Sequence, residues 1–186
     1  MLETNKEKIL AIAKRIIELP EYQPGYPMWD DRQKLIKAGI DPATKNYPGV
    51  TWCQAAACKI MRELGFDMEQ ILDIEGIGYT TANEMYDHAI AAEQNDIIQG
   101  VTAREAQELA NEGTVCIVLA PGAKHGHVAV VMPCSHEYNP EHGCFIAQAG
   151  SKNGFFYVNE IFTAPWVYPD KIRYMLLNEK VLKKIR

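Results

Sequence analysis

The sequence predicts an α+β domain, in which helices from the first part of the chain pack on an antiparallel sheet from the second part. Up to about residue 113, apolar residues recur at helical spacing between capping signals and glycines. From residue 114 onward, short apolar runs alternate with turn residues, which is the pattern of strands. Of the 186 residues, 47% are hydrophobic, which is enough for one core. Helices followed by strands are typical of the α+β class.

Four longer helices are expected in the first part of the chain. Three of them span residues 4–19, 51–64 and 102–110, and the fourth begins at Thr81. The helices that start near Thr4, Thr81 and Thr102 have a glutamate three residues later, which is the pattern of a capping box. Proline or glycine ends three of the helices, at Pro20, Gly65 and Gly113.

The segment between the first two of these helices has a different composition. Residues 20–50 hold five prolines and several aromatic residues around one short expected helix at 31–38, which Gly39 ends. Proline and aromatic residues together favour an ordered strap packed on the surface over a flexible linker. Because no domain boundary or internal repeat is visible, we expect residues 1–186 to form a single domain.

Five strands are expected in the second part. They span residues 114–120, 127–132, 145–149, 155–158 and 172–176. The second of these begins with His127 and continues with apolar residues, which predicts a buried strand. We therefore expect the core of the domain to lie between this sheet and the helices before it.

Composition excludes several classes of protein. The hydrophobic content is too high, and the net charge of −5 too small, for a disordered chain. The longest apolar runs, Val115–Ala120 and 128–132, are far shorter than the roughly 18 residues of a membrane-spanning helix. A pI near 5.6 argues against nucleic-acid binding, which usually needs a basic face. The basic residues at 180–186 are more simply a solvated end.

The cysteine count and the N-terminal residues indicate where the protein is made. Five cysteines, an odd number in a chain of this length, do not suggest a disulfide scaffold. Residues 2–19 carry seven charges and no uninterrupted apolar stretch, so we expect no signal peptide and synthesis in a reducing cytoplasm. Any exported role would need a route that this sequence does not encode.

Cys53 is the first candidate for chemistry. It lies in the first turn of an expected helix, where the helix dipole favours a thiolate and lowers the pKa of a thiol. A buried cysteine on an apolar helix face is also common, so a purely structural role is the alternative.

His127 is the matching candidate for a general base. It begins a buried strand directly after a glycine-containing turn, a position that is rigid and can still face a cleft. A third polar group should orient its imidazole. Gln148, the one polar residue in the next apolar run, and Asn153 are the candidates. His125 could serve as the base instead, although we expect it at the rim of the cleft.

Three segments together resemble a known family. They are Thr-Trp-Cys-Gln-Ala at 51–55, Gly-His-Val-Ala-Val-Val at 126–131 and Ile-Ala-Gln-Ala-Gly at 146–150. In this order they resemble the papain-like cysteine amidohydrolases of the CHAP and NlpC type, over roughly residues 45–155. The resemblance implies a papain-like core at 51–176 behind an N-terminal helix and strap at 1–50. Residues 20–50 and the C-terminal strands lie outside the match.

The resemblance also implies an activity: cleavage of amide bonds in the peptides of bacterial cell-wall peptidoglycan, without a cofactor. Cys53 and His127 match the nucleophile and the base of the family, whereas Gln148 stands where these enzymes more often have Asn, Asp, Glu or His. The thiolate would attack a peptide carbonyl, and His127 would protonate the leaving amine. The backbone N–H of Cys53 would stabilise the oxyanion, with Asn46 or Tyr47 as candidate second donors.

Trp52, beside the nucleophile, could form a wall of the substrate cleft or belong to the core. The chain holds no wall-binding repeat, which fits a bare catalytic module of phage origin or one that a partner protein delivers.

The pairing of the second and third strands decides between the two candidates for the third residue. A simple hairpin centred on Asn139 pairs His127 with Ser151 and Val130 with Gln148. In that register Gln148 lies on the opposite face from His127, and Asn153 has the right parity. A shift by one residue, for which Pro133 gives a reason, would bring Gln148 to the face of His127.

The same pairing places a second group of candidates together. Cys134 would face Cys144 and His136 would face His142, which are ligand types for zinc or, for the cysteines, a disulfide. The spacing matches no known zinc motif, and an exposed polar loop is the simpler interpretation. His88 lies on an apolar helical stripe and is interpreted as a core histidine.

Three functional hypotheses follow from these residues. The first is a cysteine amidohydrolase that acts on peptidoglycan or its stem peptides, with no nucleic-acid or membrane partner. The second is a catalytically inactive relative that binds a ligand in the same cleft. The third is a zinc-stabilised interaction domain built on Cys134, His136, His142 and Cys144.

Overall fold

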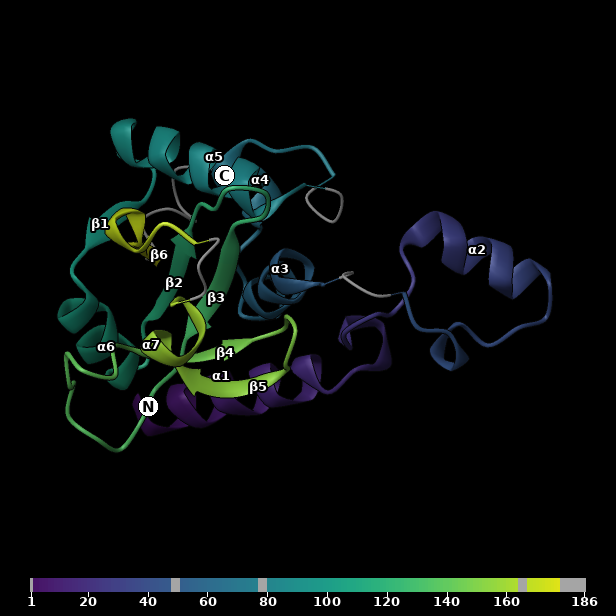
Figure 1. Cartoon of the computed structure of the whole chain (residues 1–186). Helices are drawn as coiled ribbons and strands as arrows, with labels where there is room; N and C mark the ends of the chain where they lie inside the picture. The colour runs from purple at the N-terminus through teal and green to yellow at the C-terminus, as the bar shows by residue number, and fades with distance from the viewer. Residues whose placement is uncertain (1, 48–50, 77–79, 164–166, 178–186) are drawn as a thin grey trace.

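Seven α-helices and one six-stranded antiparallel sheet form the described part of the chain in this computed structural model (Figure 1). The described residues are 2–47, 51–76, 80–163 and 167–177. The helices are α1 (Leu2–Ile17), α2 (Trp29–Lys37), α3 (Cys53–Glu63), α4 (Met68–Leu72), α5 (Ala82–Gln94), α6 (Ala103–Asn111) and α7 (Val158–Ile161). Within these described ranges, no helix is long and apolar enough to cross a membrane. The predicted α+β class is confirmed.

The sheet follows the order β1-β6-β2-β3-β4-β5, and all neighbouring strands are antiparallel. The strands are β1 (Gln99–Val101), β2 (Val115–Ala120), β3 (His127–Val131), β4 (Phe145–Gln148), β5 (Gly154–Tyr157) and β6 (Arg173–Leu177). Strands β2 and β3 lie in the middle and are buried along their whole length. Their unbroken apolar sequences are explained by cover on both faces.

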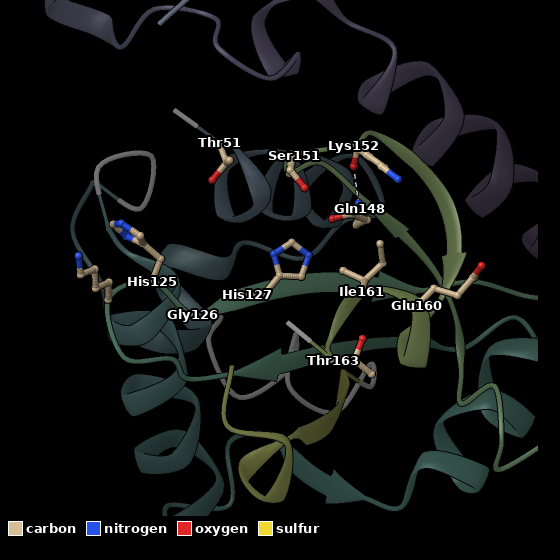
Figure 2. Close-up of a pocket in the computed structure, with 12 residues that line it drawn as sticks. Thr51, His125, Gly126, His127, Gln148, Ser151, Lys152, Glu160, Ile161 and Thr163 are labelled. Carbon is tan, nitrogen blue, oxygen red and sulfur yellow. Dashed lines mark hydrogen bonds between the residues drawn. The ribbon is translucent and has the colours of Figure 1, made fainter. Parts of the chain in front are cut away.

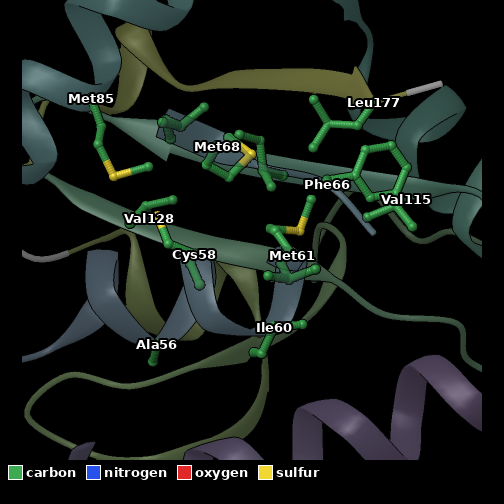
Figure 3. Packing of buried hydrophobic residues seen from close by; sticks show 14 of the residues in the cluster. Ala56, Cys58, Ile60, Met61, Phe66, Met68, Met85, Val115, Val128 and Leu177 are labelled. Carbon is green, nitrogen blue, oxygen red and sulfur yellow. The ribbon is translucent and has the colours of Figure 1, made fainter. Parts of the chain in front are cut away.

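Helices cover both faces of the sheet. Helices α1, α3 and α5 pack on one face, where Val128 and Val130 of β3 join their core. Figure 3 shows part of this core, in which Met61, Met68 and Met85 fill the space around the strands. Helices α6 and α7 pack on the other face, with Ala129 and Val131. Alternate residues of one strand thus serve two separate cores.

Local signals placed most helix starts correctly. Thr81 and Thr102 form the expected capping boxes at the starts of α5 and α6. Helix α1 instead begins at Leu2, so Thr4 lies inside the helix and is not its N-cap. The sequence did not predict α4, β1 or α7, and Val158, expected to end a strand, begins α7. These elements are five residues or shorter, too short for periodicity to reveal.

Most of the expected strap is an arm that projects from the body of the protein (Figure 1). The arm, residues 26–46, contains α2 and is closed at its base, where the Tyr47 N–H donates to the Gly25 carbonyl over 2.8 Å. The Trp52 indole also donates to the Tyr26 carbonyl over 3.2 Å. No described side chain of α2 is buried. The expected packing on the surface therefore occurs at the base of the arm and not along its length.

Candidate functional site

The register of β3 and β4 brings two of the predicted site residues together. Val130 pairs with Ala147 and Val131 with Ile146, one residue away from the simple hairpin. This shift places Gln148 on the same face of the sheet as His127, so the unshifted pairing is wrong. The reason is an asymmetric connection: Asn139 bridges to Gly143, so residues 133–138 on one side are opposed by one residue on the other.

Gln107 of α6 fixes this register at the far end of the two strands. Its Oε1 accepts from the Phe145 N–H over 2.7 Å, and its Nε2 donates to the Met132 carbonyl over 3.0 Å. The amide thus replaces one of the two hydrogen bonds that this strand pair would make, while Met132 N–H still donates to Phe145. Sequence reasoning missed Gln107; a polar residue on the buried side of an amphipathic helix was the available signal.

His127 and Gln148 face each other at the other end of these strands (Figure 2). His127 is the first residue of β3 and Gln148 the last of β4, and both are buried. Gln148 Nε2 donates to the Lys152 carbonyl, which leaves Oε1 for the imidazole. His127 Nε2 and Gln148 Oε1 are the buried polar side-chain atoms without a hydrogen-bond partner in the described residues. The imidazole nitrogen can donate a hydrogen bond and the amide oxygen can accept one, so a small movement of the two side chains would join them.

Two neighbouring residues shape the space around this pair. A Cβ atom on Gly150 would lie 2.8 Å from Gln148 Oε1 and 3.3 Å from His127 Cε1, so only glycine leaves them room. The Phe162 ring packs edge-on against the imidazole, with 5.0 Å between ring centroids. Its apolar surface isolates the imidazole from solvent on that side.

A cavity of about 520 Å³ opens beside His127 and Gln148. It lies between the start of β3, the end of β4, the turn that follows β4, and helix α7 (Figure 2). The other lining residues are Thr51, Lys124, His125, Gly126, Gly150, Ser151, Lys152, Glu160, Ile161 and Thr163. The volume is in the range of small-molecule and peptide sites. His125 is exposed at its rim, as expected.

Burial governs the electrostatics of both candidate catalytic groups. It lowers the pKa of His127 to about 4, because the imidazolium would lose its hydration, and the nearby Gln148 side chain opposes this only in part. Burial also raises the pKa of Cys53 above its ordinary value. The sequence predicted a lowered thiol pKa from the helix dipole, but the desolvation of a fully enclosed sulfur is the larger effect. At neutral pH both groups are therefore uncharged.

Cys53 lies beside the backbone of Val128, the residue after His127, but does not line the described cavity. As the first residue of α3, it belongs to the core on the α3 face, whereas His127 points to the face of α7. Its thiol donates to Gln54 Oε1 over 3.4 Å and lies beside the backbone N–H of Val128. The sulfur is thus next to the first residues of β3.

The start of α3 has no side-chain cap from its N-cap residue. Its N-cap residue, Trp52, makes no side-chain cap, whereas Asp67, Thr81 and Thr102 cap α4, α5 and α6. The first N–H groups of a helix have no partner within the helix. This end of α3 can therefore bind an oxygen atom that carries negative charge.

The other candidates for the third residue and the oxyanion donors have structural roles. Asn153 accepts from the Gly150 N–H over 3.1 Å and donates to the carbonyls of Ile17 and Tyr22, each over 2.9 Å. It therefore ties the turn after β4 to the end of α1 and does not orient His127.

Asn46, Tyr47 and Trp52 lie at the base of the arm, and none of them is among the described residues that line the cavity. The Tyr47 N–H, one of the two proposed second donors, is already bound to Gly25. The indole of Trp52 is bound to Tyr26.

The suggested zinc site does not form. Cys144 is buried and donates to the Ala103 carbonyl over 2.9 Å, while Cys134 donates to the His136 carbonyl over 3.3 Å. All five cysteines are free, and within the described ranges no three His, Cys, Asp or Glu side chains gather to hold a metal ion. The bridge between Asn139 and Gly143 replaces the simple hairpin pairing that suggested this site.

His88 is exposed and contacts the Leu72 carbonyl through Nδ1 over 2.9 Å, so its interpretation as a core histidine is wrong.

Asn83, at the start of α5, was not identified from the sequence. Its amide donates to the Gly122 carbonyl over 3.0 Å and accepts from the Gly122 N–H over 2.9 Å, which fixes the loop that leads into His127.

Comparison with known proteins gives no family for this chain. No family model matches the sequence, and no curated protein matches it either. The function is therefore inferred from the residues and geometry of the site.

Proposed function

We propose that the protein is a papain-like cysteine amide hydrolase, with Cys53 as nucleophile, His127 as base and Gln148 as the residue that orients the base. The observation that carries this proposal is the shifted strand register, which sets Gln148 Oε1 beside the His127 imidazole at the edge of a cavity. A structural core has no need for two buried polar side-chain atoms that lack partners among the described residues. The Cys, His, Gln order along the chain supports the same conclusion.

The proposed mechanism starts from a neutral pair. Because the pKa of His127 is low and that of Cys53 is high, no thiolate–imidazolium pair exists at rest. The thiol turns about its Cα–Cβ bond from Gln54 toward the imidazole when substrate binds. His127 then takes the proton as sulfur attacks the carbonyl carbon, in the manner of a serine–histidine pair.

The remaining steps use the same groups. The uncapped N–H groups at the start of α3 stabilise the oxyanion. The imidazolium, held by Gln148 Oε1, gives its proton to the leaving amine, and a thioester forms on Cys53. Water, deprotonated by His127, then attacks the thioester, which releases the carboxylic acid and restores the thiol.

The proposed substrates are the peptides of bacterial peptidoglycan. This choice depends on the resemblance to CHAP and NlpC enzymes, and the cavity supports it only in its size and its polar lining. The lining contains the basic residues Lys124 and Lys152 and the acidic residue Glu160, so it could bind both the negative and the positive groups of a peptide. No group in the proposed mechanism is a cofactor or a metal ion.

One observation favours a second candidate function, a catalytically inactive binding module. The Cys53 sulfur is buried against Val128 and does not line the described cavity. If the thiol never turns toward His127, the cavity binds a peptide and releases it unchanged. The two functions therefore differ in one step, the movement of the thiol.

Hydrolysis of purified peptidoglycan, followed by mass spectrometry of the soluble products, tests the proposal. We expect the wild-type protein to release peptides with new amino and carboxyl ends. The Cys53→Ala and His127→Ala variants should not. Cys58→Ala is the matched control, because Cys58 is a second buried thiol on the same helix; this variant should keep the activity.

Two outcomes would overturn the hydrolase proposal. Equal product release by the wild-type protein and Cys53→Ala would exclude the nucleophile. Binding of soluble stem peptides without any product, by a protein that is folded, would establish the binding module instead.

A further inference from the structure

The cavity beside the candidate catalytic pair has a charge of the opposite sign to that of the whole protein. The chain carries a formal net charge of −5. Among the described residues that line the cavity, Lys124 and Lys152 are basic and Glu160 is acidic. Figure 2 shows His125, the neighbour of Lys124, on one side of the His127 ring and Lys152 on the other. Positive charge therefore flanks the floor of the cavity.

Neither lysine is neutralised within the part of the chain that the structure describes. No ion pair found there includes Lys124 or Lys152. The carboxylate of Glu160 is already engaged, because its Oε2 accepts from the Tyr157 N–H over 2.6 Å at the start of α7. The two lysines can therefore bind an anion, whereas the carboxylate of the lining already has a backbone partner.

Both lysines lie on backbone that the site itself holds in place. The Lys152 carbonyl accepts from Gln148 Nε2. The loop that contains Lys124 is fixed at Gly122 by two hydrogen bonds with Asn83. The ends of the two lysine side chains are exposed, but their starting points are fixed, so less freedom is lost on binding than on a mobile loop.

The floor of the cavity indicates a ligand independently of the lysines. His127 and Gln148 are 5% and 3% exposed, and each has a buried polar atom without a partner among the described residues. Burial also keeps His127 uncharged at neutral pH. A charged group would lose its hydration at this floor, whereas an uncharged amide bond would lose much less. The amide bond of a ligand therefore belongs at the floor and its charged groups at the rim.

We propose that the site selects peptides with carboxylates on both sides of the amide bond that occupies the cavity, and that Lys124 and Lys152 bind these carboxylates. The inference rests on the proposed function for its choice of a peptide as the ligand. It adds that the site distinguishes a carboxylate from a carboxamide of the same shape. Because the lysines are exposed, each contributes about a two- to fivefold change in affinity.

Calorimetric titration of the Cys53→Ala variant, which lacks the proposed nucleophile, tests the proposal. The probes are soluble stem peptides from purified peptidoglycan, in their native form and after carbodiimide and excess ammonia have converted their carboxylates to carboxamides. The native peptides should bind about tenfold more tightly at low salt. The preference should largely disappear at about 1 M salt, which screens exposed charges.

Variants in the same Cys53→Ala background identify the residues responsible. Lys124→Gln and Lys152→Gln should each weaken binding of the native peptides about two- to fivefold and leave binding of the carboxamide form unchanged. Glu160→Gln keeps an acceptor for the backbone and should strengthen binding of the native peptides. Lys37→Gln is the matched control, because Lys37 is an exposed lysine of α2, outside the cavity; it should bind as the parent does.

Equal binding of the two peptide forms, no binding of either form, or an equal loss for both forms in the lysine variants would overturn the proposal. Circular dichroism confirms that each variant is folded. Hydrolysis by the wild-type protein is measured separately. A hydrolase without a preference for carboxylates and a binding module with that preference are therefore distinguishable results.

Discussion

The buried imidazole of His127 makes the stability of the protein depend on pH. Its pKa is about 4 in the folded protein and 6.5 when it is exposed in the unfolded chain. Between these values the unfolded chain binds a proton and the folded protein does not. Stability is therefore lost as the pH falls through 6.5 and toward 4, and it is fully present above 6.5.

The size of this effect follows from the two pKa values. Between about pH 7.5 and about pH 5, the linkage relation gives a loss of about 2 kcal/mol in the free energy of unfolding. The loss reaches a limit of about 3 kcal/mol below pH 4. A domain of this kind has about 5–15 kcal/mol in total, so the change is readily measured.

Urea unfolding at the two pH values, for the wild type and for His127→Gln, provides the assay. The variant lacks the titrating group, so its loss of stability between the two conditions should be smaller by about 2 kcal/mol. Contributions from the carboxylates cancel in this comparison. An NMR titration of the imidazole gives the pKa directly. A midpoint near 6.5, or equal pH dependence in both proteins, would refute the argument that burial keeps His127 neutral.

Three further results are expected. Gln148→Leu should lower the proposed rate of hydrolysis at least about tenfold, which is equivalent to 1.4 kcal/mol, because it removes the acceptor that we propose orients the base; an unchanged rate would exclude that role. Asn83→Ala should destabilise the protein by about 1–3 kcal/mol, measured by thermal unfolding, because it breaks both hydrogen bonds to Gly122. A change in stability within experimental error would mean that the loop at Gly122 keeps its conformation without Asn83. Iodoacetamide at neutral pH should label the partly exposed Cys134 before Cys53, whose pKa is raised by burial; fast labelling of Cys53 below pH 7 would contradict a buried neutral thiol.

Much of the fold could be predicted because its signals are local. The helix from Cys53 to Glu63 and the two capping boxes at Thr81 and Thr102 depend on residues within one or two turns of each other. The apolar run of β2 likewise predicted a strand. The arm was not foreseen, because proline and aromatic content does not say whether a segment has a surface to pack on.

The candidate site was predicted in part. The positions of Cys53 at a helix start and His127 at a strand start are correct. The choice between Gln148 and Asn153 could not be made, since it depends on a one-residue shift set by the loop at 133–144 and by Gln107 from a distant helix. A strand register is a property of two segments and their connection.

The sequence by itself determined which residues could carry chemistry and on which elements they lie, because capping, periodicity and strand pattern are encoded by near neighbours. The tertiary structure alone decided that Gln148 and His127 share one face, that the Cys53 thiol donates to Gln54, and that burial keeps both candidate catalytic groups uncharged at neutral pH. These properties depend on which distant side chains exclude water from each group, and the cost of desolvating a charge exceeds the effect of a helix dipole.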